Sequence, residues 1–155
     1  MDIDQTRSAD ALDFLRAGLT TAEREWPRFR LELQDVHTVP INELRTHPDL
    51  MDRVASVAPG DAYALTGAVV LVDDRGAIYA IGIGTHRVMF RVGPPSASDA
   101  EPREAIHTPR PPSMGGGQYT LPNDWLLLSP YAAVADPLPV LQAIAARARA
   151  FVSKR

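Results

Sequence analysis

The sequence predicts an α+β fold, in which a mostly antiparallel sheet of about five strands carries the N- and C-terminal helices packed on one face. Apolar residues recur at helical spacing near both ends of the chain, whereas residues 62–92 alternate between apolar runs and tight turns. The chain has 155 residues and a mass of 16.9 kDa, the size of one ordinary domain. We therefore expect a single domain over residues 1–155.

A helix is expected near the N-terminus. Ser8 stands where an N-cap belongs, and the leucines that follow it share one helical face: Leu12, Leu15 and Leu19. The segment Thr20-Thr21-Ala22-Glu23 matches a capping box, so the helix either runs through Gly18 or restarts there. Pro27 ends it in both cases, because the proline ring clashes with the preceding turn.

Two further elements are expected before the central block. Apolar and polar residues alternate strictly from Arg28 to Gln34, which predicts a half-exposed strand with its apolar face formed by Phe29, Leu31 and Leu33. The segment Thr46-His47-Pro48-Asp49 is typical of a helix start, because proline is favoured at the first helical position. Pro59-Gly60 ends this second helix.

The clearest pattern is a three-stranded antiparallel meander within residues 62–92. The apolar runs 68–72 and 77–83 are separated by Asp73-Asp74-Arg75-Gly76, where Gly76 suits the left-handed position of a hairpin turn. A second break at Gly84-Thr85 precedes the third strand, residues 86–92.

Residues 93–122 form a long Pro/Gly-rich loop, which holds seven of the fourteen prolines. A structureless stretch of this length is uncommon inside a compact domain, so it is either a functional or a mobile loop. Trp125–Leu128 is expected to be a short buried strand. Asp136-Pro137 opens the last helix, whose apolar face comprises Leu138, Leu141, Ile144, Ala145, Ala148 and Phe151.

Composition excludes several classes of function. Sixteen basic and nineteen acidic residues give a net charge of −3, without a basic run dense enough for nucleic acid. The chain contains no cysteine, which excludes disulfides, thiolate nucleophiles and Cys-based metal sites. No signal peptide or membrane-spanning stretch is recognisable, so we expect a cytoplasmic protein that binds neither nucleic acid nor membranes.

Histidines are the first candidates for chemistry. His37 and His47 lie in Asp35-Val36-His37 and His47-Pro48-Asp49, but their ten-residue gap is no known ligand spacing, so we expect no metal site. His86 is in phase with Phe90 in the third meander strand. It is either a half-buried histidine bonded to backbone or an acid–base group beside a cleft near Gly82 and Gly84.

Glycine-rich segments give no catalytic signature. Ser113-Met114-Gly115-Gly116-Gly117 lacks the Lys-Ser/Thr and the following helix of a phosphate-binding loop, and it is expected to be a flexible hinge. Neither a dinucleotide fingerprint nor a nucleophile elbow occurs in the sequence. We therefore expect no cofactor.

Arginines are the second candidates. Arg87 and Arg91 lie on the strand face opposite Phe90 and face solvent if helices cover the Phe90 side. That face is either an ordinary solvated surface or a recognition surface, because guanidinium groups bind carboxylates bidentately. Replacing both arginines with glutamate would then change the stability by no more than about 0.5 kcal/mol. Strand 86–92 leads directly into loop 93–122, so the recognition hypothesis joins residues of both into one surface for an acidic protein or a small anionic ligand. This surface consists of Arg87, Arg91, His107 and Arg110.

Two classes of function remain open. The first is a non-enzymatic binding or protein-interaction module that uses the sheet surface and loop 93–122. The alternative is a small enzyme or small-ligand protein with a pocket between loop and sheet, which uses His86 or His107 together with an arginine. A concave pocket that holds a histidine beside a carboxylate would favour the alternative.

Overall fold

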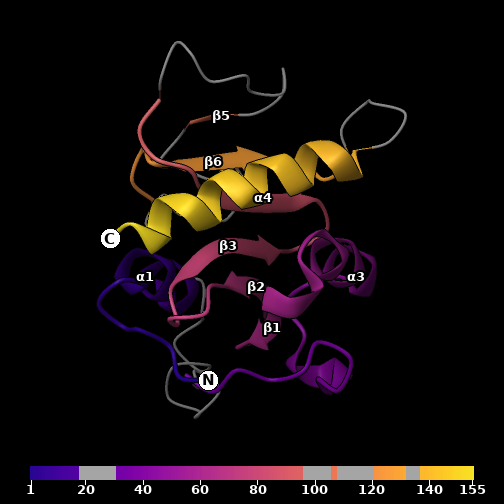
Figure 1. The fold of residues 1–155 in the computed structure, drawn as a ribbon. Coiled ribbons are helices and arrows are strands. Elements are labelled where there is room, and N and C mark those ends of the chain that lie inside the picture. Colours follow the sequence, from indigo (N-terminus) through magenta and orange to yellow (C-terminus); the bar gives the residue numbers. More distant parts are fainter. Residues whose placement is uncertain (18–30, 96–105, 108–120, 132–136) are drawn as a thin grey trace.

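An antiparallel sheet in the order β1-β2-β3-β4-β6-β5 organises the chain (Figure 1). The computed structural model describes residues 1–17, 31–95, 106–107, 121–131 and 137–155. The described strands are β1 (Ala62–Leu65), β2 (Ala68–Val72), β3 (Ile78–Ile83), β4 (Arg87–Arg91), β5 (Ile106–His107) and β6 (Trp125–Leu128). The described helices are α1 (Ala9–Ala17), α3 (Pro48–Val57) and α4 (Leu138–Ser153), with two 3-10 turns, η1 (Ile41–Glu43) and η2 (Pro59–Asp61).

The meander is confirmed, and it has one more strand than the sequence predicts. Strands β1 to β4 pair antiparallel in chain order, and β4 then pairs with β6. Gly76 has a φ of 85°, so the β2–β3 turn uses the left-handed conformation that glycine adopts at low cost. These short connections place β3 and β4 at the centre of the sheet.

Both faces of the sheet are covered, which corrects one sequence expectation. Val69 and Leu71 of β2 belong to the core cluster of α3 and α4, whereas Val70 belongs to the cluster of α1. The α+β class and the terminal helices are confirmed, but α1 and α4 lie on opposite faces. All residues of β2 and β3 are buried, and strands that are apolar on both sides need a helix on each. Figure 1 shows α4 lying across the sheet.

The helices begin close to the expected positions. The Ser8 hydroxyl does not cap α1; it donates to the carbonyl of Gly76 (3.2 Å) and accepts from the backbone N–H of Ile78 (3.0 Å). In α3, the His47 ring accepts from the backbone N–H of Asp49. Helix α4 starts at Leu138, and its predicted apolar face is buried or partly buried. The predicted cap Asp136, like Leu19, 20–23 and Pro27, lies outside the described residues.

Two predicted segments differ from the structure. In the described part of segment 28–34, the only β-pairing is an isolated bridge between Gln34 and Ala64, and Phe29 lies outside that part. Loop 93–122 contains the two-residue strand β5, which pairs with β6. This strand was not predicted, because two residues are too few to show an alternating pattern. Among the described residues, no helix is long and apolar enough to cross a membrane.

Candidate functional site

Arg91 is not on a solvent-facing surface, which corrects the sequence expectation. Its side chain lies under α1, and the residue is only 8% exposed. The guanidinium donates to the Asp124 carboxylate (Nε to Oδ2, 2.9 Å) and to the carbonyl of Arg7 (3.0 Å), and lies 3.6 Å from the Asp10 carboxylate. Because α1 covers this face, a charged residue here requires partners, and Arg91 uses its donors to fix α1 on the sheet.

The described residues do not form the single surface that the sequence predicted around Arg91. Arg87 is half-buried at the start of β4. His107 pairs with Leu126 as the second residue of β5, and Arg110 lies outside the described residues.

His86 lies in the turn between β3 and β4 and not in the strand. It is exposed, and its Nδ1 lies 2.8 Å from the hydroxyl of its neighbour Thr85. The nearby Gly82 does not open a cleft: a Cβ there would lie 2.7 Å from Cγ1 of Val69 and 3.1 Å from Cγ2 of Val54. Glycine at this position permits close packing of α3 on the sheet.

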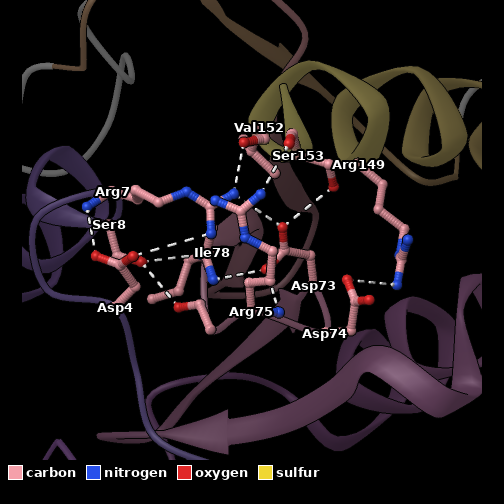
Figure 2. Close-up of polar contacts among 12 residues, drawn as sticks. Asp4, Arg7, Ser8, Asp73, Asp74, Arg75, Ile78, Arg149, Val152 and Ser153 are labelled. Carbon is pink, nitrogen blue, oxygen red and sulfur yellow. Dashed lines mark hydrogen bonds and ion pairs between the residues drawn. The ribbon is translucent and has the colours of Figure 1, made fainter. Parts of the chain in front are cut away.

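Asp73, which is fully buried, is the centre of a junction between three elements (Figure 2). One carboxylate oxygen accepts from the backbone N–H groups of Arg75 (2.9 Å) and Ala77 (2.8 Å). The other accepts from the Arg7 guanidinium (3.0 Å) and the Ser153 hydroxyl (3.1 Å). The β2–β3 turn is thereby tied to the start of α1 and the end of α4.

The electrostatics of this junction are those of a stabilised carboxylate. Burial by itself raises the pKa of Asp73, but hydrogen bonds from Ala77, Arg75 and Arg7 outweigh burial and hold that pKa below its usual value. Arg7 also donates to the carbonyl of Val152 (2.6 Å). Because both oxygens of Asp73 are occupied, this carboxylate has a structural role.

A second buried polar contact links β3 to α4. The Tyr79 hydroxyl donates to the Asp61 carboxylate (2.7 Å), which also accepts from Nε of Arg149 (2.8 Å). Burial, followed by the hydrogen bond to Asp61, raises the pKa of the Tyr79 hydroxyl. This tyrosine therefore stays protonated and acts as a hydrogen-bond donor.

A pocket of about 550 Å³ opens at the outer edge of β1. It forms because the chain leaves this edge directly after the bridge between Gln34 and Ala64. The Asp35 carboxylate accepts from the backbone N–H of His37 (2.8 Å), and the Asp35 carbonyl accepts from that of Thr38 (3.1 Å), so the chain turns away. The opposite wall is the C-terminal half of α3 with η2.

The pocket is lined by both apolar and polar residues. Its apolar lining residues are Leu33, Val36, Ala55, Pro59, Ala62 and Tyr63, and its polar ones are Asp35, His37, Asp52 and Ser56. Asp35 and Asp52 are exposed, and no Lys or Arg is among the described residues that line the pocket. A lining that combines apolar side chains with two exposed carboxylates is suited to a ligand that carries a positive charge on an apolar stem.

Sequence reasoning missed this pocket, although part of it was readable. Asp52, Ala55 and Ser56 follow the i, i+3, i+4 spacing of one helix face, opposite the buried face of α3. The Asp35-Val36-His37 segment also has the composition of a turn. No pattern in the sequence, however, shows that these two segments meet across the edge of a strand.

His37 and His47 do not form a metal centre. His47 caps α3, whereas His37 lies on the opposite wall of the pocket from that helix. Within the described ranges, no group of three or more His, Asp and Glu side chains is positioned to hold a metal ion.

Comparisons with known proteins found no match to this chain: no family model, no curated protein and no solved structure. The geometry of the pocket therefore carries the functional assignment.

Proposed function

We propose that this protein is a small non-catalytic binding module whose site is the pocket at the edge of β1. The ligand carries a positively charged group on an apolar stem. The observation that supports this proposal is that the pocket lining combines apolar side chains with the exposed carboxylates of Asp35 and Asp52. Opposite charge contributes both to affinity and to the rate of encounter in such a site.

A titration with butylguanidinium tests this function, with butylurea and pentanoate as neutral and anionic controls of similar size. In 1H–15N spectra, we expect butylguanidinium alone to shift the amides of the pocket lining, including Asp52, Ser56 and Tyr63. An Asp52→Asn variant should bind it more weakly. The matched control is Asp13→Asn, an exposed carboxylate on α1 that does not line the pocket. Equal shifts with all three probes would contradict the charge assignment.

A small enzyme is the second candidate, because the pocket does hold a histidine beside carboxylates. Asp35, however, accepts from the backbone N–H of His37 and not from its ring, so the described geometry gives the imidazole no orienting partner. We expect no turnover of chromogenic aryl ester, phosphate ester or glycoside substrates. Turnover that His37→Ala abolishes would favour the enzyme.

The acidic partner predicted from the sequence is a weaker proposal. Its surface requires Arg91 together with Arg87, His107 and Arg110, and Arg91 is engaged with Asp124 inside the fold. A cytoplasmic location likewise stays a prediction from the sequence.

A further inference from the structure

One residue of the chain, Gln34, already pairs with the outer edge of β1, which is the edge that faces away from β2. Ala64 donates its N–H to the carbonyl of Gln34 (2.8 Å) and accepts from the N–H of Gln34 (2.9 Å). Both backbone groups of Ala64 therefore point away from β2. In an antiparallel ladder these directions repeat every second residue, so the N–H and the carbonyl of Ala62 also point outward. Ala62 lines the pocket, which places these two groups at its wall.

The chain does not continue this pairing at Ala62. An antiparallel extension from the Gln34 bridge would bring Val36 opposite Ala62, but the turn that begins at Asp35 removes it. Among the described residues, no backbone–backbone hydrogen bond outside the helices and the strand ladders involves Ala62. Within the described part of the chain, the pocket therefore contains an open strand position with both a donor and an acceptor.

We propose that the occupant of this pocket is an extended peptide that adds to the edge of β1 at Ala62 and presents a basic side chain. This inference rests on the proposed function and names its ligand class. Strand addition provides main-chain hydrogen bonds, while the pocket selects the side chain. The peptide continues the edge where residue 34 of the chain itself ends its pairing.

The register fixes which side chain enters the pocket. Residues directly opposite each other in an antiparallel pair project to the same face, and Ala62 packs toward the α3 and α4 cluster. The peptide residue opposite Ala62 therefore projects toward α3, where Asp52 is exposed, and its stem crosses Ala55. The residue that follows it projects to the other face, where Tyr63 is partly buried with the α1 cluster. The positions before it are those of Asp35 and Gln34, because Gln34 pairs with Ala64. The expected motif is thus basic–apolar, with the basic residue at the start of the added strand.

The test uses the full chain and three blocked peptides. The first is acetyl-Arg-Val-Thr-amide, which places no residue opposite Ala64, where Gln34 already pairs. The second replaces its Arg with Glu, and the third carries a methyl group on the Arg backbone nitrogen. Acetyl-arginine-amide serves as the small cation without a strand. Dissociation constants come from 1H–15N titrations, in which the Ala62 amide reports backbone pairing.

We expect the Arg peptide to bind and to shift the Ala62 amide, and the Glu peptide not to bind. The methylated peptide loses one hydrogen bond and should bind about five- to tenfold more weakly. Asp52→Asn should raise the dissociation constant of the Arg peptide to a similar extent, about five- to tenfold. Asp13→Asn, the exposed control on α1, should leave its dissociation constant unchanged.

Other outcomes separate the two proposals. If acetyl-arginine-amide binds as tightly as the peptide and methylation has no effect, strand addition is wrong while the cation pocket stands. If neither the Arg peptide nor acetyl-arginine-amide shifts the amides of the pocket, and butylguanidinium also does not bind, both proposals are wrong. If the free chain sediments as a dimer with its Ala62 amide protected from exchange, a second copy occupies the edge and the peptide proposal is overturned.

Discussion

The junction around Asp73 and the pocket at β1 both contain carboxylates, but the two regions differ in what those carboxylates contact. Asp73 is fully buried and accepts four hydrogen bonds from three parts of the chain (Figure 2). Asp35 and Asp52 are exposed, and within the described residues neither forms an ion pair. The first region uses charge to hold the fold together, and the second presents it to solvent.

This difference shows that the burial of a charged residue predicts its role better than its position in the sequence does. Arg91 and Asp73 lie in unremarkable sequence contexts, yet each joins α1 to the sheet. A buried charge that loses its partner is strongly destabilising, whereas an exposed one is nearly neutral. The contrast predicts graded effects for matched substitutions.

The largest effect is expected for Arg91→Glu. The new carboxylate would face Asp124 and Asp10 under α1, so we expect a loss of about 3–5 kcal/mol in the free energy of unfolding. Arg87→Glu, on the same strand face but half-buried, should cost only about 0.5 kcal/mol. Urea melts of the two single variants measure both values. Equal small losses would show that the α1 contact with Arg91 contributes nothing.

Asp73→Asn should cost about 2–3 kcal/mol, because an amide cannot accept all four hydrogen bonds or neutralise Arg7. Its neighbour Asp74 is exposed, and its carboxylate lies 3.4 Å from the Arg149 guanidinium, so Asp74→Asn should cost less than about 0.5 kcal/mol. Thermal melts of both variants provide the comparison.

The lowered pKa of the Asp73 carboxyl group makes the free energy of unfolding depend on pH. The pKa of Asp73 is lower in the folded than in the unfolded chain, so the unfolded chain takes up a proton first. Its stabilisation is complete above the unfolded pKa of about 4 and is lost as the pH falls through the folded value. Asp73→Asn should therefore flatten the stability profile below about pH 4. An unchanged profile would contradict this role of Asp73.

Tyr79→Phe tests an intermediate case. The substitution removes one hydrogen bond to Asp61 but leaves the Asp61 contact with Arg149, so we expect a loss of about 1 kcal/mol. The variant should unfold cooperatively with the same m-value in urea. A loss as large as that of Arg91→Glu would mean that Asp61 depends on the tyrosine for its position.

The sequence was sufficient for the central strands of the sheet because their signals are local. Turn glycines such as Gly76 and the apolar runs around it specify the hairpins, and Pro48 marks the start of α3. The same apolar run 68–72 carried evidence for a sheet covered on both faces, since all five of its residues are buried. The prediction that both terminal helices pack on one face was therefore wrong, and it left Arg91 in solvent.

The candidate site was less predictable because it depends on contacts between distant segments. The ion pair of Arg91 with Asp124 spans 33 positions, and no periodic pattern encodes it. The pocket likewise requires residues 33–37 to meet α3 across the edge of β1. His86 was singled out from its phase with Phe90, but the turn at Thr85 places it outside the strand.

The most direct measurement compares stability and binding in one double variant, Asp35→Asn with Asp52→Asn. If these carboxylates serve recognition and not folding, the free energy of unfolding should change by less than about 0.5 kcal/mol. The affinity for butylguanidinium should fall by about tenfold or more in the same protein. A double variant that is destabilised as strongly as Asp73→Asn, or that keeps its affinity for the cation, would contradict the account.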